Sequence, residues 1–189
     1  MCKVFQLAVL CAFVGSLGSR SSFAFSDANW TSVGAGVNDW VDALAVSGTN
    51  VYAGGRFSRA GGISVGYIAK WNGQTWSGLG TGLNGRVYAL AASGTNLYVG
   101  GRFTTAGGIV ANNIARWNGS SWSALGSGIG NPPDYFEYVY AVAVVGSNVF
   151  AGGSFSAAGS VGAHNIAMWN GNSWSPVGTL SGVGIYAAR

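Results

Sequence analysis

One stretch of the chain is repeated, and this repetition constrains the fold more than any other feature. The stretch runs from Ile68 to Gly80, returns from Ile114 to Gly126, and returns again from Ile166 to Gly178. Each copy contains Trp-Asn-Gly followed three residues later by a second Trp. Self-similarity at a period of about 20 to 50 residues is typical of proteins that stack one small structural unit. We therefore expect a repeat architecture.

The Asn-Gly pair predicts a tight β-hairpin, because it lies between two runs rich in aromatic and aliphatic residues. We take Asn72 and Gly73 as the two residues of the turn. Ala69 would then lie opposite Trp76, with Trp71 as the diagonal neighbour of Trp76 on the same face. Burial of the two indole rings would stabilise the hairpin by several kcal/mol.

Four strand candidates recur in the same order in every repeat. In the first repeat they are Val41–Val46, Val51–Gly55 and the two arms of the Asn-Gly hairpin. No window shows a helical period of apolar residues over three turns. Four short antiparallel strands, repeated about every 40 to 50 residues, are typical of a β-propeller blade. The sequence thus predicts an all-β propeller of four-stranded antiparallel blades, with three full repeats and partial terminal strands.

The same residues resemble a known family. Two glycines close each second strand, as at Gly54 and Gly55, an aromatic residue follows, and a Trp opens the fourth strand. This pattern resembles the kelch repeat. The string from Leu97 to Trp122 resembles the kelch-like propeller repeats of secreted bacterial proteins, of galactose oxidase and of fungal cortical proteins. The resemblance covers nearly all of the mature chain, and it implies a propeller that serves as a binding platform.

Residues 1–24 have the features of a secretory signal peptide. Lys3 is followed by an apolar run over residues 4–14 and then by small residues. This run is much shorter than the roughly 20 residues that span a bilayer, so we expect no membrane span. Cys2 and Cys11 both lie in this segment, so the mature chain would contain no thiol. The expected location is secreted, at the cell envelope, or periplasmic in a bacterium.

Residues 25–189 would then form the repeat domain, with repeats at about 30–76, 77–122 and 123–174 and a partial repeat at 175–189. A lone fourth strand is expected around Trp30 to Val33, and a lone first strand at 183–188. Closed propellers have about four to eight blades. Three explanations stay open: a fragment of a longer array, an incomplete fourth blade, or self-association of several copies to complete the ring.

Charge is scarce in this chain. Nine basic residues face five acidic ones, and without Lys3 and Arg20 the balance falls to about +2. No run of basic residues occurs, so the sequence lacks the basic patch that would bind a nucleic acid or an anionic membrane surface. The remaining partner classes are a protein or a glycan at a cell surface.

The variable loops are expected to share one side of the domain. In an up-and-down sheet, the connections between blades and those from the second to the third strand lie on one side, while the nearly invariant turns lie on the other. The variable side also receives an insertion in the third repeat. Aromatic, acidic and arginine side chains together suit a glycan or a peptide. The candidate binding residues are Asn38, Asp39, Trp40, Arg56, Arg86, Arg102, Asp134, Tyr135, Phe136, Glu137 and Tyr138. In the simpler alternative, the insertion merely caps a blade edge.

Nothing in the sequence indicates an enzyme, a metal or a cofactor. His164 is the only histidine, and no repeat reproduces the spacing of Asp39 and Asp42 that could suggest calcium. Asp134 and Glu137 lie on one loop, which does not favour a glycosidase pair. A copper site like that of galactose oxidase would need paired histidines and a cysteine-linked tyrosine, and a sialidase would need an arginine cluster and Asp-containing turns. The alternatives are a fragment of a larger propeller enzyme and a purely structural extracellular array.

Overall fold

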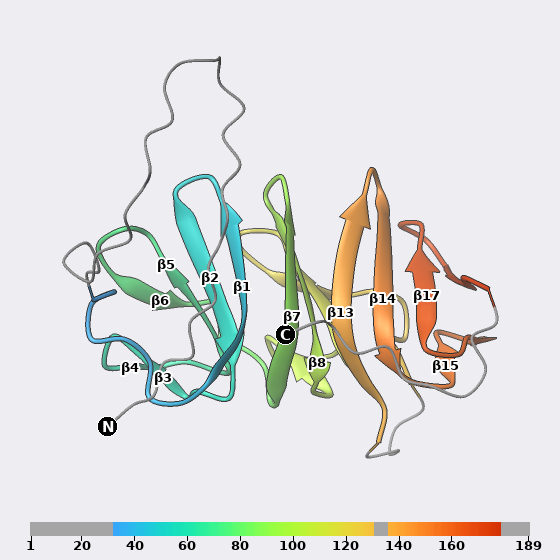
Figure 1. Ribbon diagram of the computed structural model, residues 1–189, viewed down its shortest axis with the longest axis horizontal. Coiled ribbons are helices and arrows are strands. Elements are labelled where there is room, and N and C mark those ends of the chain that lie inside the picture. The colour runs from blue at the N-terminus through green and yellow to red at the C-terminus, as the bar shows by residue number, and fades with distance from the viewer. Residues whose placement is uncertain (1–31, 131–135, 179–189) are drawn as a thin grey trace, which may run out of the picture. The chain divides into compact units, whose positions relative to one another are not determined.

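The computed structural model of the chain describes residues 32–130 and 136–178, and every regular element in them is a β-strand (Figure 1). These residues include no helix that could cross a membrane. The chain divides into two units, residues 1–33 and 34–189. In the first, only Ser32 and Val33 are described, and neither is in a strand. The expected signal peptide, Trp30 and the expected strand at 183–188 lie outside the described residues.

Three four-stranded antiparallel sheets make up the second unit, which confirms the predicted all-β class and the blade-like repeats. The first sheet has the order β1 (Val41–Ser47), β2 (Asn50–Gly55), β5 (Ile68–Trp71), β6 (Trp76–Gly78). The second has the order β7 (Arg86–Ser93), β8 (Asn96–Arg102), β11 (Ile114–Trp117), β12 (Trp122–Ala124). The third has the order β13 (Tyr138–Val145), β14 (Asn148–Ser154), β17 (Ile166–Trp169), β18 (Trp174–Pro176). Among the described strands, these sheets do not close into a ring.

Each connection from the second to the third blade strand contains a small hairpin that the sequence analysis did not anticipate. The three hairpins are β3–β4 (Arg59–Ala60 and Ile63–Ser64), β9–β10 (Thr105–Ala106 and Ile109–Val110) and β15–β16 (Ala157–Ala158 and Val161–Gly162). In the first hairpin, Gly61 and Gly62 both have positive φ, at 57° and 85°, as a two-residue turn requires. The long loops are therefore ordered extensions of the blades.

The register predicted for the Asn-Gly hairpin is wrong. Trp71 pairs directly with Trp76, and Ala69 pairs with Gly78, so the connection has four residues. The reason is the side chain of Asn72, whose Oδ1 accepts hydrogen bonds from the backbone N–H groups of Gln74 and Thr75 at 2.9 and 2.8 Å.

The shared face of the two Trp residues was predicted correctly. Their ring centroids lie 5.5 Å apart, and the same pair recurs at 5.3 and 5.5 Å in the second and third sheets.

The double glycines each have a separate steric role. A side chain at Gly54 or Gly100 would collide with Val87 or Val139 of the next blade, so the first glycine lets neighbouring sheets approach closely. A side chain at Gly55 would collide with the carbonyl oxygen of Trp40. The second glycine therefore leaves room for the backbone that enters each blade.

Neighbouring blades are joined by their first strands and by Trp side chains. β7 packs against β1 and β2, and β13 packs against β7 and β8. The indole Nε1 of Trp122 donates to the carbonyl of Leu79 in the preceding repeat, and Trp174 donates to Leu125, both at 2.8 Å. Continuous apolar clusters therefore run from one blade into the next.

The first sheet leaves one of its faces exposed. Val87 and Val139 are completely buried against the preceding blade, whereas the equivalent Val41 is 43% exposed. Leu44 and Val46 on the same strand are 38% and 54% exposed. We call Val41, Leu44 and Val46 the leading face of the first sheet.

Candidate functional site

An open cavity of about 530 Å³ lies where the first and second blades begin. Its volume is within the range of roughly 300 to 1,000 Å³ found for small-ligand sites. No aliphatic side chain lines it. The lining residues are Asp39, Arg56, Tyr67, Asn84, Gly85, Arg86, Tyr88 and Arg102. Four of the predicted candidates, Asp39, Arg56, Arg86 and Arg102, therefore surround one cavity.

A β-bulge at the start of each first strand directs one extra side chain toward this region. The register shifts between Val41 and Ala43 in β1 and at the equivalent places in β7 and β13. The extra residues are Asp42, Tyr88 and Tyr140. A bulge leaves a residue outside the normal pairing and re-aims its side chain, which is a common device beside binding sites.

Three arginines of the cavity each lie over an aromatic ring, and we call Arg56, Arg86 and Arg102 the arginine cluster. The guanidinium carbon of Arg56 is 5.5 Å from the ring centre of Trp40. Arg86 lies 4.9 Å over Tyr88, and Arg102 lies 5.4 Å over Tyr138 of the next blade. Stacking fixes the plane of a guanidinium and leaves the N–H groups at its edge able to donate.

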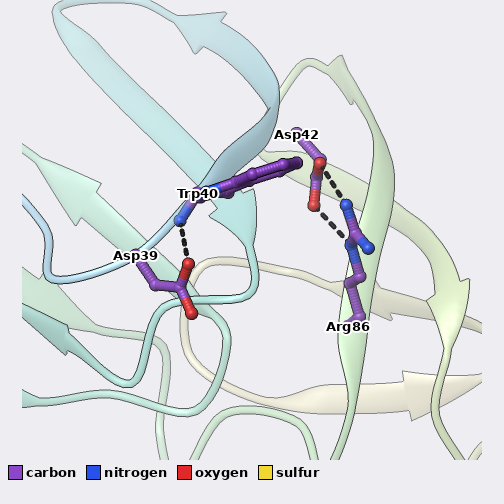
Figure 2. A network of polar contacts seen from close by, with 4 residues as sticks. All are labelled: Asp39, Trp40, Asp42 and Arg86. Carbon is purple, nitrogen blue, oxygen red and sulfur yellow. Dashed lines mark hydrogen bonds and ion pairs between the residues drawn. The ribbon is translucent and has the colours of Figure 1, made fainter. Parts of the chain in front are cut away.

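Arg86 is also held by Asp42, which lies in the neighbouring blade (Figure 2). Its Nε donates to Oδ2 and its second terminal nitrogen donates to Oδ1, both at 2.7 Å. Two parallel hydrogen bonds to one carboxylate fix both distance and orientation. These bonds raise the pKa of Arg86 above its already high ordinary value, although burial opposes the shift. Arg86 is therefore cationic throughout the physiological pH range.

Arg56 and Arg102 differ from Arg86, because neither guanidinium has a carboxylate partner within the part of the chain that the structure describes. Both residues are exposed. The cavity lining thus offers two guanidinium groups whose charge is not neutralised by a paired acid, in addition to the fixed Arg86.

Tyr67 adopts a backbone conformation that is unusual for its residue type. Its φ is +61°, and the equivalent positions in the other repeats are occupied by Asn113 and Asn165 at +59° and +65°. Asn tolerates this left-handed conformation, whereas a bulky residue there is an outlier that costs of the order of 1 kcal/mol. The first blade therefore accepts strain where it presents a tyrosine to the cavity.

Asn38 and Asp39 prove to have local structural contacts. The Asn38 side chain accepts from the N–H groups of Ser58 and Arg59 at 3.0 and 2.8 Å and donates to the Ser58 hydroxyl at 3.2 Å. It therefore ties the blade entry to the first small hairpin. The carboxylate of Asp39 accepts from the N–H of Trp40 at 2.8 Å, as Figure 2 shows, and Asp39 still lines the cavity.

The predicted insertion site is only partly described. Asp134 and Tyr135 lie outside the described residues. Phe136 is 76% exposed, but it does not line the cavity. Glu137 is 8% exposed, and its Oε1 accepts from the N–H and the hydroxyl of Ser156 at 2.8 and 2.7 Å.

Glu137 therefore makes the contact that an Asn makes in the first two repeats. In the second repeat, Asn84 accepts from the N–H groups of Thr104 and Thr105, at 2.9 and 3.0 Å. Because the buried carboxylate of Glu137 accepts these hydrogen bonds from Ser156, its role is structural. Tyr138 is the insertion residue that reaches the arginine cluster, through its stacking with Arg102.

Sequence reasoning missed three residues of this region: Asp42 as a binding partner of Arg86, and Tyr67 and Tyr88 in the lining. Tyr67 could have been found, because it replaces an Asn present in both other repeats. Asp42 and Tyr88 depend on the bulge, which shifts two side chains out of simple alternation. A sequence read by strict alternation does not reveal that shift.

The described residues contain no group of three His, Cys, Asp or Glu side chains that could hold a metal ion. His164 is exposed, and its carbonyl accepts from the N–H of Ile166. No known family model matches the chain, and a comparison with curated proteins found no relative.

Proposed function

We propose that this chain is an exported, non-enzymatic binding module with kelch-like propeller blades, and that it recognises a glycan or a protein through the side that carries the arginine cluster. The observation that carries the proposal is the arrangement of Arg56, Arg86 and Arg102 around one open cavity, each over an aromatic ring. Export is inferred from the N-terminal segment alone.

The repeats give this proposal its physical basis. The hairpin turns, with their Asn-Gly pairs, have the same contacts in all three blades, so their sequence is accounted for by backbone geometry. The cavity residues vary more among the repeats. Arg86 is replaced by Trp40 and Tyr138, and the equivalent residues Arg56 and Arg102 are replaced by Ser154 in the third repeat. Side chains that vary on a constant scaffold are where binding specificity is usually built.

A purely structural extracellular array is a second candidate, favoured by the exposed leading face of the first sheet. Val41 exposes apolar surface that the equivalent Val87 and Val139 bury against a preceding blade. Leu44 and Val46 are exposed on the same strand. An array would cover this face with another blade, from a longer chain or from a second copy. Sedimentation equilibrium of the purified protein tests self-association directly, since an array of copies would give a mass that rises with concentration.

The binding proposal is tested on glycan and surface-protein arrays with the full chain and two variants. Trp40→Ala with Tyr88→Ala removes two of the stacking rings, and Gln74→Ala alters an exposed residue in the first repeated hairpin turn. We expect the first variant to lose a signal that the second retains.

An array signal that survives the loss of both rings would contradict the proposed binding side. The bound glycan, if one is found, is also incubated with the protein, and released reducing sugar is measured. Release above that of a buffer control would contradict the non-enzymatic proposal and would favour a propeller enzyme.

A further inference from the structure

We infer that the ligand is a carboxylated saccharide, and that its carboxylate binds between Arg56 and Arg102. This inference rests on the proposed binding function and specifies the chemistry of the ligand. Three guanidinium groups and one carboxylate, that of Asp39, line the cavity, and Asp42 neutralises only Arg86. An excess of positive charge in an open cavity favours an anion.

The form of the donors points to a carboxylate. A guanidinium presents N–H groups in one plane, which match the two oxygens of a carboxylate. Trp40 and Tyr138 cover one face each of Arg56 and Arg102 and so restrict how these planes can turn. Because the donors are oriented before binding, less side-chain entropy is lost when the anion arrives.

Arg86 is suited to positioning the site rather than to holding the anion. Its Nε and one terminal nitrogen already donate to Asp42. The pair fixes the second blade against the first at the cavity, and Arg86 in turn lies over Tyr88. The tyrosine ring is thereby held in the cavity wall.

The rest of the lining favours a sugar over a peptide. An aliphatic anchor of a peptide would find no aliphatic side chain to pack against, because none lines this cavity. It offers instead the rings and hydroxyl groups of Tyr67 and Tyr88 and the carboxylate of Asp39. Sugar rings present C–H faces that pack on aromatic rings and hydroxyl groups that donate to carboxylates.

Tyr67 supplies an independent sign that the cavity is a built site. It is held at a positive φ that its Asn equivalents adopt without difficulty. The Tyr67 ring packs partly against the core and also lines the cavity, so the one blade that accepts this strain is the one that places a tyrosine there.

The test is isothermal titration calorimetry of the full chain with oligogalacturonate. Two controls accompany it: the methyl ester of oligogalacturonate, which is a neutral saccharide with the same backbone, and oligoglutamate, which is an acidic peptide. We expect oligogalacturonate to bind, and both the ester and the peptide to bind at least tenfold more weakly. Each arginine–carboxylate contact is worth about tenfold in affinity. The double variant R56Q/R102Q should therefore lose about a hundredfold, whereas Arg59→Gln, which changes an exposed arginine outside the cavity, should stay within about twofold.

Equal binding of the acid and its ester, unchanged binding by R56Q/R102Q, or preference for oligoglutamate would overturn the inference. Thermal unfolding of the double variant checks that it folds, as expected for two exposed residues. If oligogalacturonate does not bind but an array ligand depends on Trp40 and Tyr88, the inference fails while the proposed function stands. If the ring variant keeps every array ligand, the proposed function itself fails.

Discussion

At the scale of single residues, the fold depends on side chains that accept hydrogen bonds from backbone N–H groups in turns and loops. Asn72, Asn118 and Asn170 each accept two backbone N–H groups within their own turn. Glu137 accepts from the backbone N–H and the hydroxyl of Ser156 and so joins two separate segments. The sequence predicted a structural role for the turn asparagines, whereas Glu137 was a binding candidate whose Oε1 proves to have structural partners.

Replacement of a turn asparagine should destabilise the protein. Asn72→Ala removes an acceptor used by the N–H groups of Gln74 and Thr75. We expect a loss of about 1 kcal/mol in the free energy of unfolding, measured by urea denaturation. Gln74→Ala is the matched control in the same turn and should change it by less than about 0.5 kcal/mol. Equal effects of the two changes would refute this account of the turn.

Glu137 gives a second residue-level prediction. Glu137→Ala removes the acceptor of two partly buried hydrogen bonds, from the N–H and the hydroxyl of Ser156, and should cost about 2 kcal/mol in the free energy of unfolding. Glu137→Gln retains an oxygen acceptor and should cost less than half as much. Both are measured in the same urea series. If Glu137→Ala is as stable as the parent chain, the assigned structural role of this carboxylate is wrong.

At the scale of the elements, the close approach of neighbouring sheets depends on glycine. Gly100 lies on β8, where a side chain would collide with Val139 and Val142 of the next blade. The sequence marked this position by its double glycine, but only the packing of β13 against β8 explains why the first of the two is needed.

Gly100→Ala should cost about 2 kcal/mol in the free energy of unfolding, because the added methyl group overpacks the contact between blades. Gly162 is the control. It has no positive φ, and a side chain there would meet nothing within 4 Å. Gly162→Ala should be neutral within about 0.5 kcal/mol. A Gly100→Ala variant with unchanged thermal stability would argue against the tight contact between the second and third blades.

The sequence predicted most of the elements and about half of the site. The blade strands follow from alternation and from the repeated Trp-Asn-Gly. The small hairpins were missed, since each has strands of only two residues. At the site, Arg56 and Arg102 were recognised by their place in variable loops, and the structure brings them together with Arg86. Tyr88 and Asp42 were missed because a β-bulge, which strict alternation cannot reveal, decides where they point.

At the scale of the whole molecule, equivalent positions in the three blades differ in burial according to whether a blade precedes them. Val87 is fully buried, whereas Val41 is 43% exposed. Val87→Ala should therefore cost about 2 kcal/mol in the free energy of unfolding, and Val41→Ala less than about 0.5 kcal/mol. Chemical denaturation of both variants measures this difference. A similar cost at both positions would mean that the leading face of the first sheet is covered in solution, as an array requires.

The central claim is that binding occurs on the side of the arginine cluster and not on the side of the repeated hairpin turns. Hydrogen exchange of the full chain with and without oligogalacturonate, followed by mass spectrometry of its peptides, tests this most directly. The account predicts slower exchange over residues 38–40, 56–67, 84–88 and 101–103, with no change over the turns 72–75, 118–121 and 170–173. Protection of those turns without protection over the residues of the arginine cluster would contradict it.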